Sequence, residues 1–579
     1  MVGEPDGDAA TKDLTITADS AQLPLASDEL KVNKLTLNLK GGLDLGLGSV
    51  KGKSDLQLGG MGASQNIFIS NTYDPLTDPI SGGYKVAYNT VNHVLSGFNA
   101  VNLEGPNSVY FDAGSLTSTI KIKAAQDIIV RGDVNVSGQA SKVDFVTGRD
   151  FKLNAGTKLN IEGATAATNF NVEAGNDITF GQGAKATLKT AASAPGDAKI
   201  NANLKAVLGK VTFDQNAALK IDTDKAGRVD VTTKELQVEQ GAEIDTGSNG
   251  TFGLNADVLT DHTGGTGPSI KGAGTLAIQP ITSGQAMHIG NPASAPAGAL
   301  TITSDQLNGH LFGQDFIKMF LGAHSTGVGK AGVVTVDGLN LQKAPGKKAV
   351  DVSLGAGQEV KVGAGGMTIG DGARLNVFTQ KLSNAPVGGA PRGKITVGDM
   401  SSLHVYVNDI DDLQASAGSP AVVGTGGILG LRTLDAGKTL ALGNGVTGDM
   451  KITNEFMKNV VGTGFSEYDF GQGGKDGGTT QSTINIGDFD IGADRSKHTY
   501  ITADNINIKG KFVQHGTDSV ILRTRGTAKE EAGGSIEAQN LRLEFKGNYD
   551  LSSEDNKIGT VAANNVGDVS ITSDKLTIG

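Results

Sequence analysis

The sequence predicts an all-β protein, and specifically a parallel β-helix in which short strands stack coil upon coil. Three observations favour this fold: one strand phrase recurs along the chain, glycine supplies 84 of the 579 residues, and apolar residues are spread evenly. Glycine at this level, with only 14 prolines and no collagen period, indicates very many turns. Because the apolar residues are not gathered in a few clusters, we expect one thin, extended core.

The recurring phrase is a segment of alternating apolar and polar residues that stops at a small polar corner. It is LTITADSAQL at 14–23, LTITSDQLNG at 300–309 and VSITSDKLTIG at 569–579. A second phrase leads from a small-residue corner into a strand that ends at glycine, as in NAGTKLNIEG at 154–163 and EAGNDITFGQG at 173–183. Both phrases predict strands of four to six residues bounded by Gly, Asn and Asp.

Recurrence every 20 to 30 residues or so is typical of a solenoid. A single short coil cannot bury its apolar face alone, but stacked neighbours cover one another. We therefore predict one continuous β-solenoid over residues 1–579. A chain of β-sandwiches is the alternative, since sandwiches also have short, regularly spaced strands, although they seldom repeat one corner phrase. The side chains expected to face the interior include Ile128, Val130, Leu159, Ile161, Ile178 and Phe180.

Three stretches interrupt the strand rhythm. Residues 305–324 and 454–465 place apolar residues at helix-like spacing, and each follows a phrase whose Asp or Asn suits a helix N-terminus. We expect short helices or ordered excursions there. Residues 70–89 gather tyrosines and prolines, which predicts a large loop.

Several phrases carry a family resemblance. NKIGTVAANNVGDVSITSDKLTIG at 556–579 and MKITNEFMKNVVGTGF at 450–465 resemble repeats of filamentous-haemagglutinin-like exoproteins, as do ADNINIKG at 503–510 and NAGTKLNIEG at 154–163. Those exoproteins are large adhesins that Gram-negative bacteria secrete by the two-partner route. The resemblance covers most of the chain in patches.

The resemblance implies a right-handed parallel β-helix, passage through a two-partner transporter of the outer membrane, and a secreted protein at the bacterial cell surface. It also implies a shaft segment that mediates attachment or biofilm matrix cohesion, with extracellular polysaccharide or a host or bacterial cell surface as partner. The family's amino-terminal secretion domain, with its Asn-Pro-Asn phrases, is not found, so we expect an internal segment of a larger protein. The stalk of a contact-dependent inhibition effector and an autotransporter passenger stay open as variants.

Composition argues against several other classes of protein. The chain has no cysteine, which rules out both disulfides and thiolate metal sites. Its net charge of −11 is spread without a concentrated basic block, so we expect no nucleic-acid partner. No run of about 18 apolar residues occurs, and we expect no transmembrane helix.

Arg131, Gly132 and Asp133 form an RGD tripeptide, a sequence that integrins bind when a flexible loop displays it. Here it lies between two alternating segments, DIIV at 127–130 and VNVSG at 134–138. A tight corner between strands explains the tripeptide as well as a receptor-binding role does. Both hypotheses are therefore carried forward.

Asp488, Asp490 and Asp494 lie in GDFDIGAD at 487–494, and oxygen-rich loops of this kind suit calcium. An EF-hand loop would need a carboxylate at the position of Thr499, which has none. Outward aspartates that alternate with inward apolar residues explain the same spacing. Calcium is thus an alternative to a solvated acidic face, and no other cofactor is expected.

No catalytic residue is expected. In AHSTGVGKA at 323–331, Ala323 stands where a nucleophile elbow needs glycine, and His324 stands where a phosphate loop needs it. Some β-helices are polysaccharide lyases, hydrolases or tailspikes, but their clefts usually rely on aromatic platforms. Aromatic residues make up 5% of this chain and tryptophan is absent. A polysaccharide-active β-helix enzyme is therefore the alternative function.

Overall fold

The computed structural model describes residues 107–579 with gaps, together with the strands β1–β10 before residue 107. The gaps are 117–118, 139–141, 164–167, 191–198, 223–226, 266, 342–349, 387–389, 417, 436, 472–480 and 493–496. The chain divides into two compact units. Unit 1 comprises residues 1–276 and 306–316, and unit 2 comprises residues 277–305 and 317–579. A single continuous solenoid over 1–579 stays a prediction.

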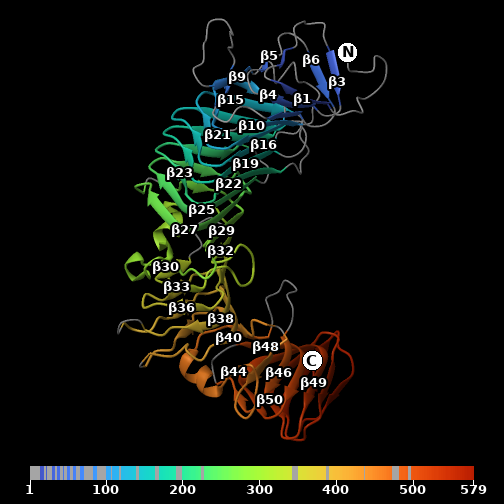
Figure 1. Ribbon diagram of the computed structural model, residues 1–579. Coiled ribbons are helices and arrows are strands. Elements are labelled where there is room, and N and C mark those ends of the chain that lie inside the picture. The colour runs from blue at the N-terminus through green and yellow to red at the C-terminus, as the bar shows by residue number, and fades with distance from the viewer. Residues whose placement is uncertain are drawn as a thin grey trace. The chain divides into compact units, whose positions relative to one another are not determined.

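Unit 1 is built from columns of strands, and each strand pairs in parallel with the strand one coil further along the chain (Figure 1). The first column consists of β1 (Leu14–Ala18), β4 (Leu35–Leu39), β7 (Leu56–Gly59), β10 (Ala100–Gly105), β13 (Thr119–Ala124), β16 (Lys142–Thr147), β19 (Thr168–Ala174), β22 (Ile200–Ala206), β25 (Gly227–Glu239) and β27 (Thr251–His262).

Two further columns complete the coils of unit 1. The second consists of β8 (Asn66–Ser70), β9 (Gly83–Ala87), β11 (Val109–Phe111), β14 (Ile128–Val130), β17 (Phe151–Leu153), β20 (Ile178–Phe180) and β23 (Lys210–Phe213), and it continues into the later halves of β25 and β27. The third consists of β12 (Gly114–Leu116), β15 (Val134–Gly138), β18 (Lys158–Gly163), β21 (Lys185–Thr190), β24 (Ala218–Ile221), β26 (Glu243–Asp245) and β28 (Ile270–Lys271). The short pairs β2 (Ala21–Gln22) with β5 (Leu43–Asp44) and β3 (Glu29–Val32) with β6 (Ser49–Gly52) lie outside these columns.

Unit 2 repeats this arrangement. Its longest column consists of β32 (Lys318–Leu321), β35 (Asp351–Gly355), β38 (Arg374–Ser383), β40 (Ser402–Asp409), β42 (Ile428–Arg432), β45 (Glu467–Phe470), β48 (His498–Ile508), β49 (Lys511–Glu530), β50 (Ser535–Glu544) and β52 (Lys557–Asn564). A four-stranded column consists of β34 (Leu339–Leu341), β37 (Met367–Ile369), β39 (Ile395–Val397) and β41 (Val422–Gly424).

The remaining strands pair beside these columns. They are β29 (Thr275–Gln279), which contains the boundary between the units, β30 (Met287–Gly290), β31 (Leu300–Ile302), β33 (Val333–Asp337), β36 (Glu359–Val362), β43 (Thr439–Leu442), β44 (Met450–Ile452), β46 (Gln481–Ile486), β47 (Phe489–Asp490), β51 (Asn548–Leu551), β53 (Val569–Ile571) and β54 (Thr577–Ile578). Together these parallel sheets confirm the predicted all-β fold, a parallel β-solenoid.

Period-two alternation positions the core. In β19, for example, Phe170 and Val172 are 0% and 1% exposed, while Asn171 between them faces outward. Inward phenylalanines of successive coils then contact one another, as Phe180 and Phe213 do with their ring centroids 4.5 Å apart. The interior side chains expected from the sequence are all buried, namely Ile128, Val130, Leu159, Ile161, Ile178 and Phe180.

Within the described residues, helical structure is confined to single turns. Within 305–324, Gln306–His310 forms a turn whose backbone departs from helical geometry at Asn308 and Gly309, and Lys318–Leu321 is strand β32. A π-helical turn occupies Phe456–Val460 within 454–465, and a 3-10 turn that the sequence did not suggest occupies Pro292–Ser294. The loop expected at 70–89 lies largely outside the described residues, although β9 falls within it.

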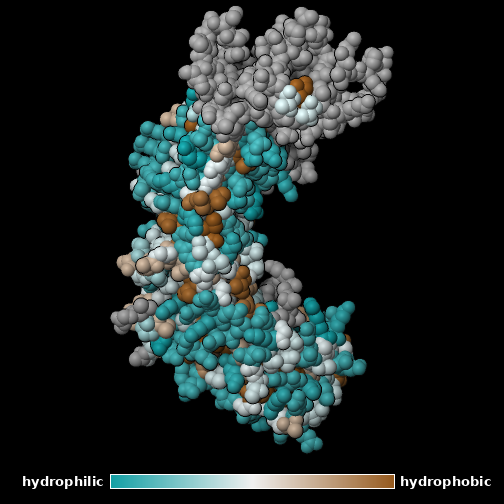
Figure 2. Space-filling view, in the orientation of Figure 1, coloured by the Kyte–Doolittle hydropathy of each residue, from teal (hydrophilic) through white to brown (hydrophobic). Residues whose placement is uncertain are grey.

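The surface visible in Figure 2 is mostly hydrophilic over the described residues, with small separate hydrophobic spots. This agrees with the alternation, because the outward positions are filled by Asn, Asp, Lys and Thr. Within the described ranges, no helix has both the length and the apolar character needed to span a membrane.

Candidate functional site

The RGD tripeptide forms the corner between β14 and β15. The backbone N–H of Arg131 donates to the carbonyl of Phe111 at 2.7 Å, one coil earlier. A Cβ atom added to Gly132 would lie 2.3 Å from the backbone nitrogen of Ala113, so only glycine fits where the two coils approach. The corner is therefore packed against its neighbour and is not a projecting loop.

Both charged side chains of the tripeptide also contact neighbouring coils. Arg131 donates two hydrogen bonds to Asp112, at 2.9 and 3.0 Å, and its guanidinium lies 4.8 Å from the ring centroid of Tyr110. The carboxylate of Asp133 accepts the backbone N–H of Lys158 at 2.8 Å. These contacts favour the structural corner over the receptor-binding role.

The aspartates considered for calcium are held by protein groups. The carboxylate of Asp488 accepts the backbone N–H of Lys511 at 3.0 Å. That of Asp490 accepts the backbone N–H of Gly492 at 2.7 Å and lies 2.9 Å from His515 Nε2. Asp494 lies outside the described residues. Among those that are described, no three His, Asp or Glu side chains are grouped so that they could hold a metal ion.

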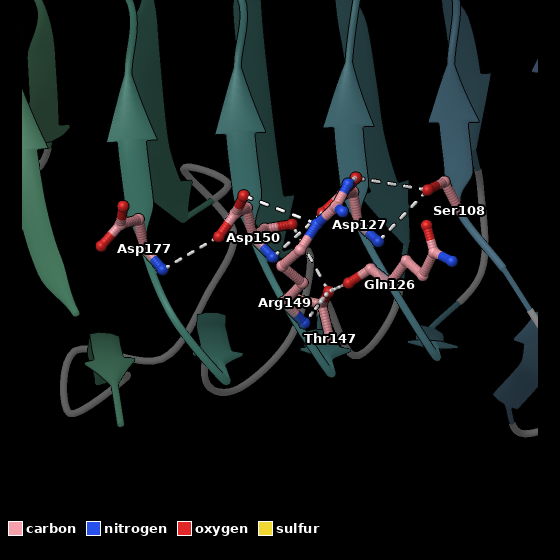
Figure 3. Close-up of polar contacts among 7 residues, drawn as sticks. All are labelled: Ser108, Gln126, Asp127, Thr147, Arg149, Asp150 and Asp177. Carbon is pink, nitrogen blue, oxygen red and sulfur yellow. Dashed lines mark hydrogen bonds and ion pairs between the residues drawn. The ribbon is translucent and has the colours of Figure 1, made fainter. Parts of the chain in front are cut away.

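A regular polar arrangement in unit 1 is a column of three carboxylates, Asp127, Asp150 and Asp177, which we call the carboxylate column. Each precedes a strand of the second column directly: β14, β17 and β20. Figure 3 shows the three residues side by side at the starts of these strands, with Ser108 at one end. The parallel register brings them together, because each strand pairs with the equivalent strand of the next coil.

Backbone hydrogen bonds link the members of the carboxylate column. The carboxylate of Asp127 accepts the N–H of Asp150 at 3.2 Å, and that of Asp150 accepts the N–H of Asp177 at 3.2 Å. The carboxylate of Asp177 accepts the N–H of Lys210 at 2.7 Å, and the hydroxyl of Ser108 accepts the N–H of Asp127 at 3.3 Å. At each corner, a side chain thus satisfies a backbone donor of the following coil.

Arg149 completes the column (Figure 3). Its Nε donates to one oxygen of Asp127 at 2.7 Å, and its Nη2 donates to the other. Burial would raise the pKa of Asp127, which is 6% exposed, but the hydrogen bonds and charge of Arg149 and the N–H of Asp150 together lower it. The same hydrogen bond and charge raise the pKa of Arg149. Asp127 is therefore ionised at neutral pH and ties two coils together.

Sequence reasoning did not single out this column, although a signal was present. The segments QDIIV at 126–130, RDFKL at 149–153 and NDITF at 176–180 each place Asp directly before a three-residue strand. When these segments are aligned on the aspartate, the three residues after it are the ones that pair between successive coils.

In unit 2, three large side chains form a row on the outer face of the longest column, which we call the outer stack: Phe378, Tyr406 and Arg432. They occupy matched positions of β38, β40 and β42. The rings of Phe378 and Tyr406 are stacked with centroids 4.4 Å apart, and the Arg432 guanidinium lies 5.1 Å from the Tyr406 centroid. Although they face outward, they are only 8%, 7% and 5% exposed.

Burial sets the protonation states around the outer stack. It raises the pKa of Tyr406 to about 12, and it lowers the pKa of Arg432. It also lowers the pKa of His404, on the same strand as Tyr406, to about 4, with a further contribution from the charge of Arg374. Proton transfer at neutral pH is served best by groups that titrate near it. The outer stack thus serves packing between successive strands more than acid–base chemistry.

A second guanidinium–aromatic group lies near the carboxyl end of unit 2. Arg523 stacks on Tyr500 at 4.2 Å from the ring centroid and donates to Glu544 at 2.6 Å. Glu544 also pairs with Arg542 at 2.6 Å. The carboxylate is thus shared by two guanidinium groups, which links β49 with β50.

No family model, no curated protein and no solved structure matches this chain.

Proposed function

We propose that this chain is a segment of the shaft of a secreted bacterial surface adhesin that mediates attachment or biofilm cohesion by binding glycan or matrix polysaccharide. The observation that carries the proposal is the coil-to-coil register, in which equivalent strands pair along each unit and carboxylates bridge successive corners. Such a stack resists bending, because each coil is hydrogen-bonded along its length to the next.

The outer surface supports the adhesive part of the proposal. Hydrogen-bonded rows of polar side chains, such as Asn201 on Asn169 at 3.0 Å and Asn507 on Asn485 at 3.0 Å, hold amide groups in fixed positions. Fixed amides and hydroxyls suit sugar hydroxyl groups, since little side-chain freedom is lost on binding. The stalk of a contact-dependent inhibition effector would share these features.

The proposal is tested by measuring how beads coated with the protein attach to cells. Beads coated with the folded chain are expected to bind bacterial or host cells saturably, and free polysaccharide from the same cells is expected to compete. Beads coated with acid-denatured chain serve as the control. Equal binding by both kinds of bead, or no binding by the folded chain to any cell, would contradict the proposal.

The enzyme alternative has its own measurement. Incubation of the chain with acidic and neutral polysaccharides, followed by assays for reducing ends and for ultraviolet-absorbing unsaturated products, would reveal hydrolase or lyase activity. We expect no product. Turnover by the folded chain would replace the adhesin proposal with the enzyme one.

A further inference from the structure

A square of four asparagines lies on the outer face of unit 1, and we call it the amide square. Asn169 and Asn171 lie on β19, and Asn201 and Asn203 lie on β22. The register pairs Asn169 with Asn201 and Asn171 with Asn203. The alternate residues of both strands are buried in the core, so the four amides share the outward face.

Hydrogen bonds fix three of the four amides. Asn201 Nδ2 donates to Asn169 Oδ1 at 3.0 Å, and Asn171 Nδ2 donates to Asp144 Oδ1 at 2.6 Å. Asn203 is exposed, and its side chain forms no hydrogen bond with the described residues. The square thus presents one amide with all its donors and acceptors available beside three whose orientation is set.

The charges around the amide square are paired within the same face. Lys142 pairs with Asp144 at 2.9 Å on one flank, Arg228 pairs with Asp230 at 2.5 Å on the other, and Lys205 pairs with Glu173 at 2.7 Å along the edge. Each of these cations has its anion beside it. A polyanion or polycation would have to break the pairs to gain a partner, whereas an uncharged ligand would not.

We propose that the amide square binds an uncharged polysaccharide, with Asn203 as its central contact. Each amide supplies both a donor and an acceptor, which matches a sugar hydroxyl, itself a donor and an acceptor. Successive strands space the amides about 4.8 Å apart, so neighbouring amides lie close enough to contact one extended chain. This inference rests on the proposed adhesive function and assigns it a face and a ligand class.

A matched control exists on another face of the same unit. Asn160 Nδ2 donates to Asn135 Oδ1 at 2.8 Å on β18 and β15, which repeats the ladder bond between Asn201 and Asn169. Asn135→Ala/Asn160→Ala removes the same kind of bond without touching the square. Asn203→Ala is the cleanest test variant, because Asn203 makes no ladder bond that folding would lose.

The experiment measures binding of soluble β-glucan, mannan and galactan, with hyaluronan and heparin for comparison, by isothermal titration calorimetry. At least one uncharged polymer is expected to bind, and its affinity should change little when salt is raised from about 0.05 M to about 0.5 M, since no net charge is involved. Asn203→Ala should weaken binding severalfold, and Asn201→Ala/Asn203→Ala about tenfold. The Asn135→Ala/Asn160→Ala control should bind like the wild type.

Three results would overturn the inference: no uncharged polymer binds, only the acidic polymers bind and do so in a salt-dependent way, or Asn203→Ala and the control bind equally. Circular dichroism and thermal unfolding of all variants separate lost binding from lost structure. Failure here is distinct from failure of the proposed function. If the coated beads still capture cells, the adhesin proposal stands and only the face or the ligand class is wrong.

Discussion

The carboxylate of Asp127 shows how one side chain holds two coils together. It is 6% exposed and accepts hydrogen bonds from Arg149 and from the backbone N–H of Asp150. A buried anion is stable only with such partners. Removing it leaves the donors of the next coil unsatisfied, so its contribution is measurable.

Asp127→Ala is expected to lower the free energy of unfolding by about 1–3 kcal/mol, because the backbone N–H of Asp150 and the guanidinium of Arg149 lose their acceptor. Urea denaturation at neutral pH measures this. Since the folded-state pKa of Asp127 is lowered from 3.8, its contribution is present above that value and is lost as the pH falls below it. The difference in the free energy of unfolding between wild type and Asp127→Ala should therefore shrink in acid. A difference that does not depend on pH would contradict the lowered pKa of Asp127.

His404 makes a second pH-dependent contribution, of different origin. Its imidazole lies against Gly430, where an added Cβ would be 2.2 Å from its Cδ2 atom, and burial lowers its pKa to about 4. The unfolded chain therefore takes up the proton first, so stability is lost as the pH falls from about 6.5 to about 4.

Between about pH 7 and about pH 5, the wild type is expected to lose roughly 1–2 kcal/mol more than His404→Gln, which cannot be protonated. Denaturant unfolding at both pH values gives the comparison. Parallel curves for wild type and His404→Gln would show that the imidazole does not titrate as inferred.

The RGD corner yields a prediction about attachment. Asp133→Glu changes the tripeptide that integrins recognise. The longer side chain is still expected to accept the backbone N–H of Lys158. Cell attachment by the variant should match the wild type, because Arg131 and Asp133 serve contacts between coils. A loss of attachment with an unchanged melting temperature would restore the receptor-binding hypothesis.

At the scale of secondary-structure elements, the pairing of neighbouring strands accounts for the outer stack. Phe378, Tyr406 and Arg432 meet because β38, β40 and β42 pair in register, each contributing one outward position. Removing the middle ring breaks two contacts at once and leaves a cavity in a row that is nearly fully buried.

Tyr406→Ala should therefore destabilise the protein by about 3–5 kcal/mol, whereas Tyr406→Phe, which keeps the ring, should cost less than about 1 kcal/mol. A double-mutant cycle with Phe378→Leu and Tyr406→Leu should give a coupling of about 0.5–1.5 kcal/mol. Chemical denaturation of the four proteins measures it. A coupling near zero would mean that the stacked geometry adds nothing beyond burial.

The same elements show what sequence can reveal here. Alternation in segments such as KLNIEG at 158–163 predicted the buried Leu159 and Ile161, because the period of a strand depends only on local residues. The outer stack was missed because its members come from different coils. Although the chain has few aromatic residues, the register brings Phe378 and Tyr406 together in a stack that is nearly fully buried. Coil length varies, with Lys123 bonded to Glu104 19 residues away and Asn201 to Asn169 32 residues away, so alignment of distant strands needed the structure.

For the molecule as a whole, parallel pairing has a kinetic consequence. Most of the strand pairs described join segments about one coil apart. Even the nearest pairs in sequence, β43 with β44 and β30 with β31, match residues 10 and 13 positions apart and are parallel, so none is a tight antiparallel hairpin. Loops must therefore close before any pair forms, which slows folding.

Refolding from denaturant is expected to include phases of about a second or longer, and to pass through intermediates because the chain is long. Stopped-flow circular dichroism measures the rates. Phases limited by proline isomerisation would be accelerated by a prolyl isomerase, so the phases that remain unchanged report strand assembly. Refolding completed within milliseconds would contradict this expectation.

The carboxylate column also bears on how such a chain changes over generations. Asp127 and Asp150 occupy equivalent places in successive coils, and Ile128 and Phe151 follow them as paired residues. A deletion from Ile128 to Asp150 would join Asp127 directly to Phe151 and place a strand of the same register after the same carboxylate. Recombination between equivalent phrases would thus lengthen or shorten the protein by whole coils and leave each surviving strand with a matching partner.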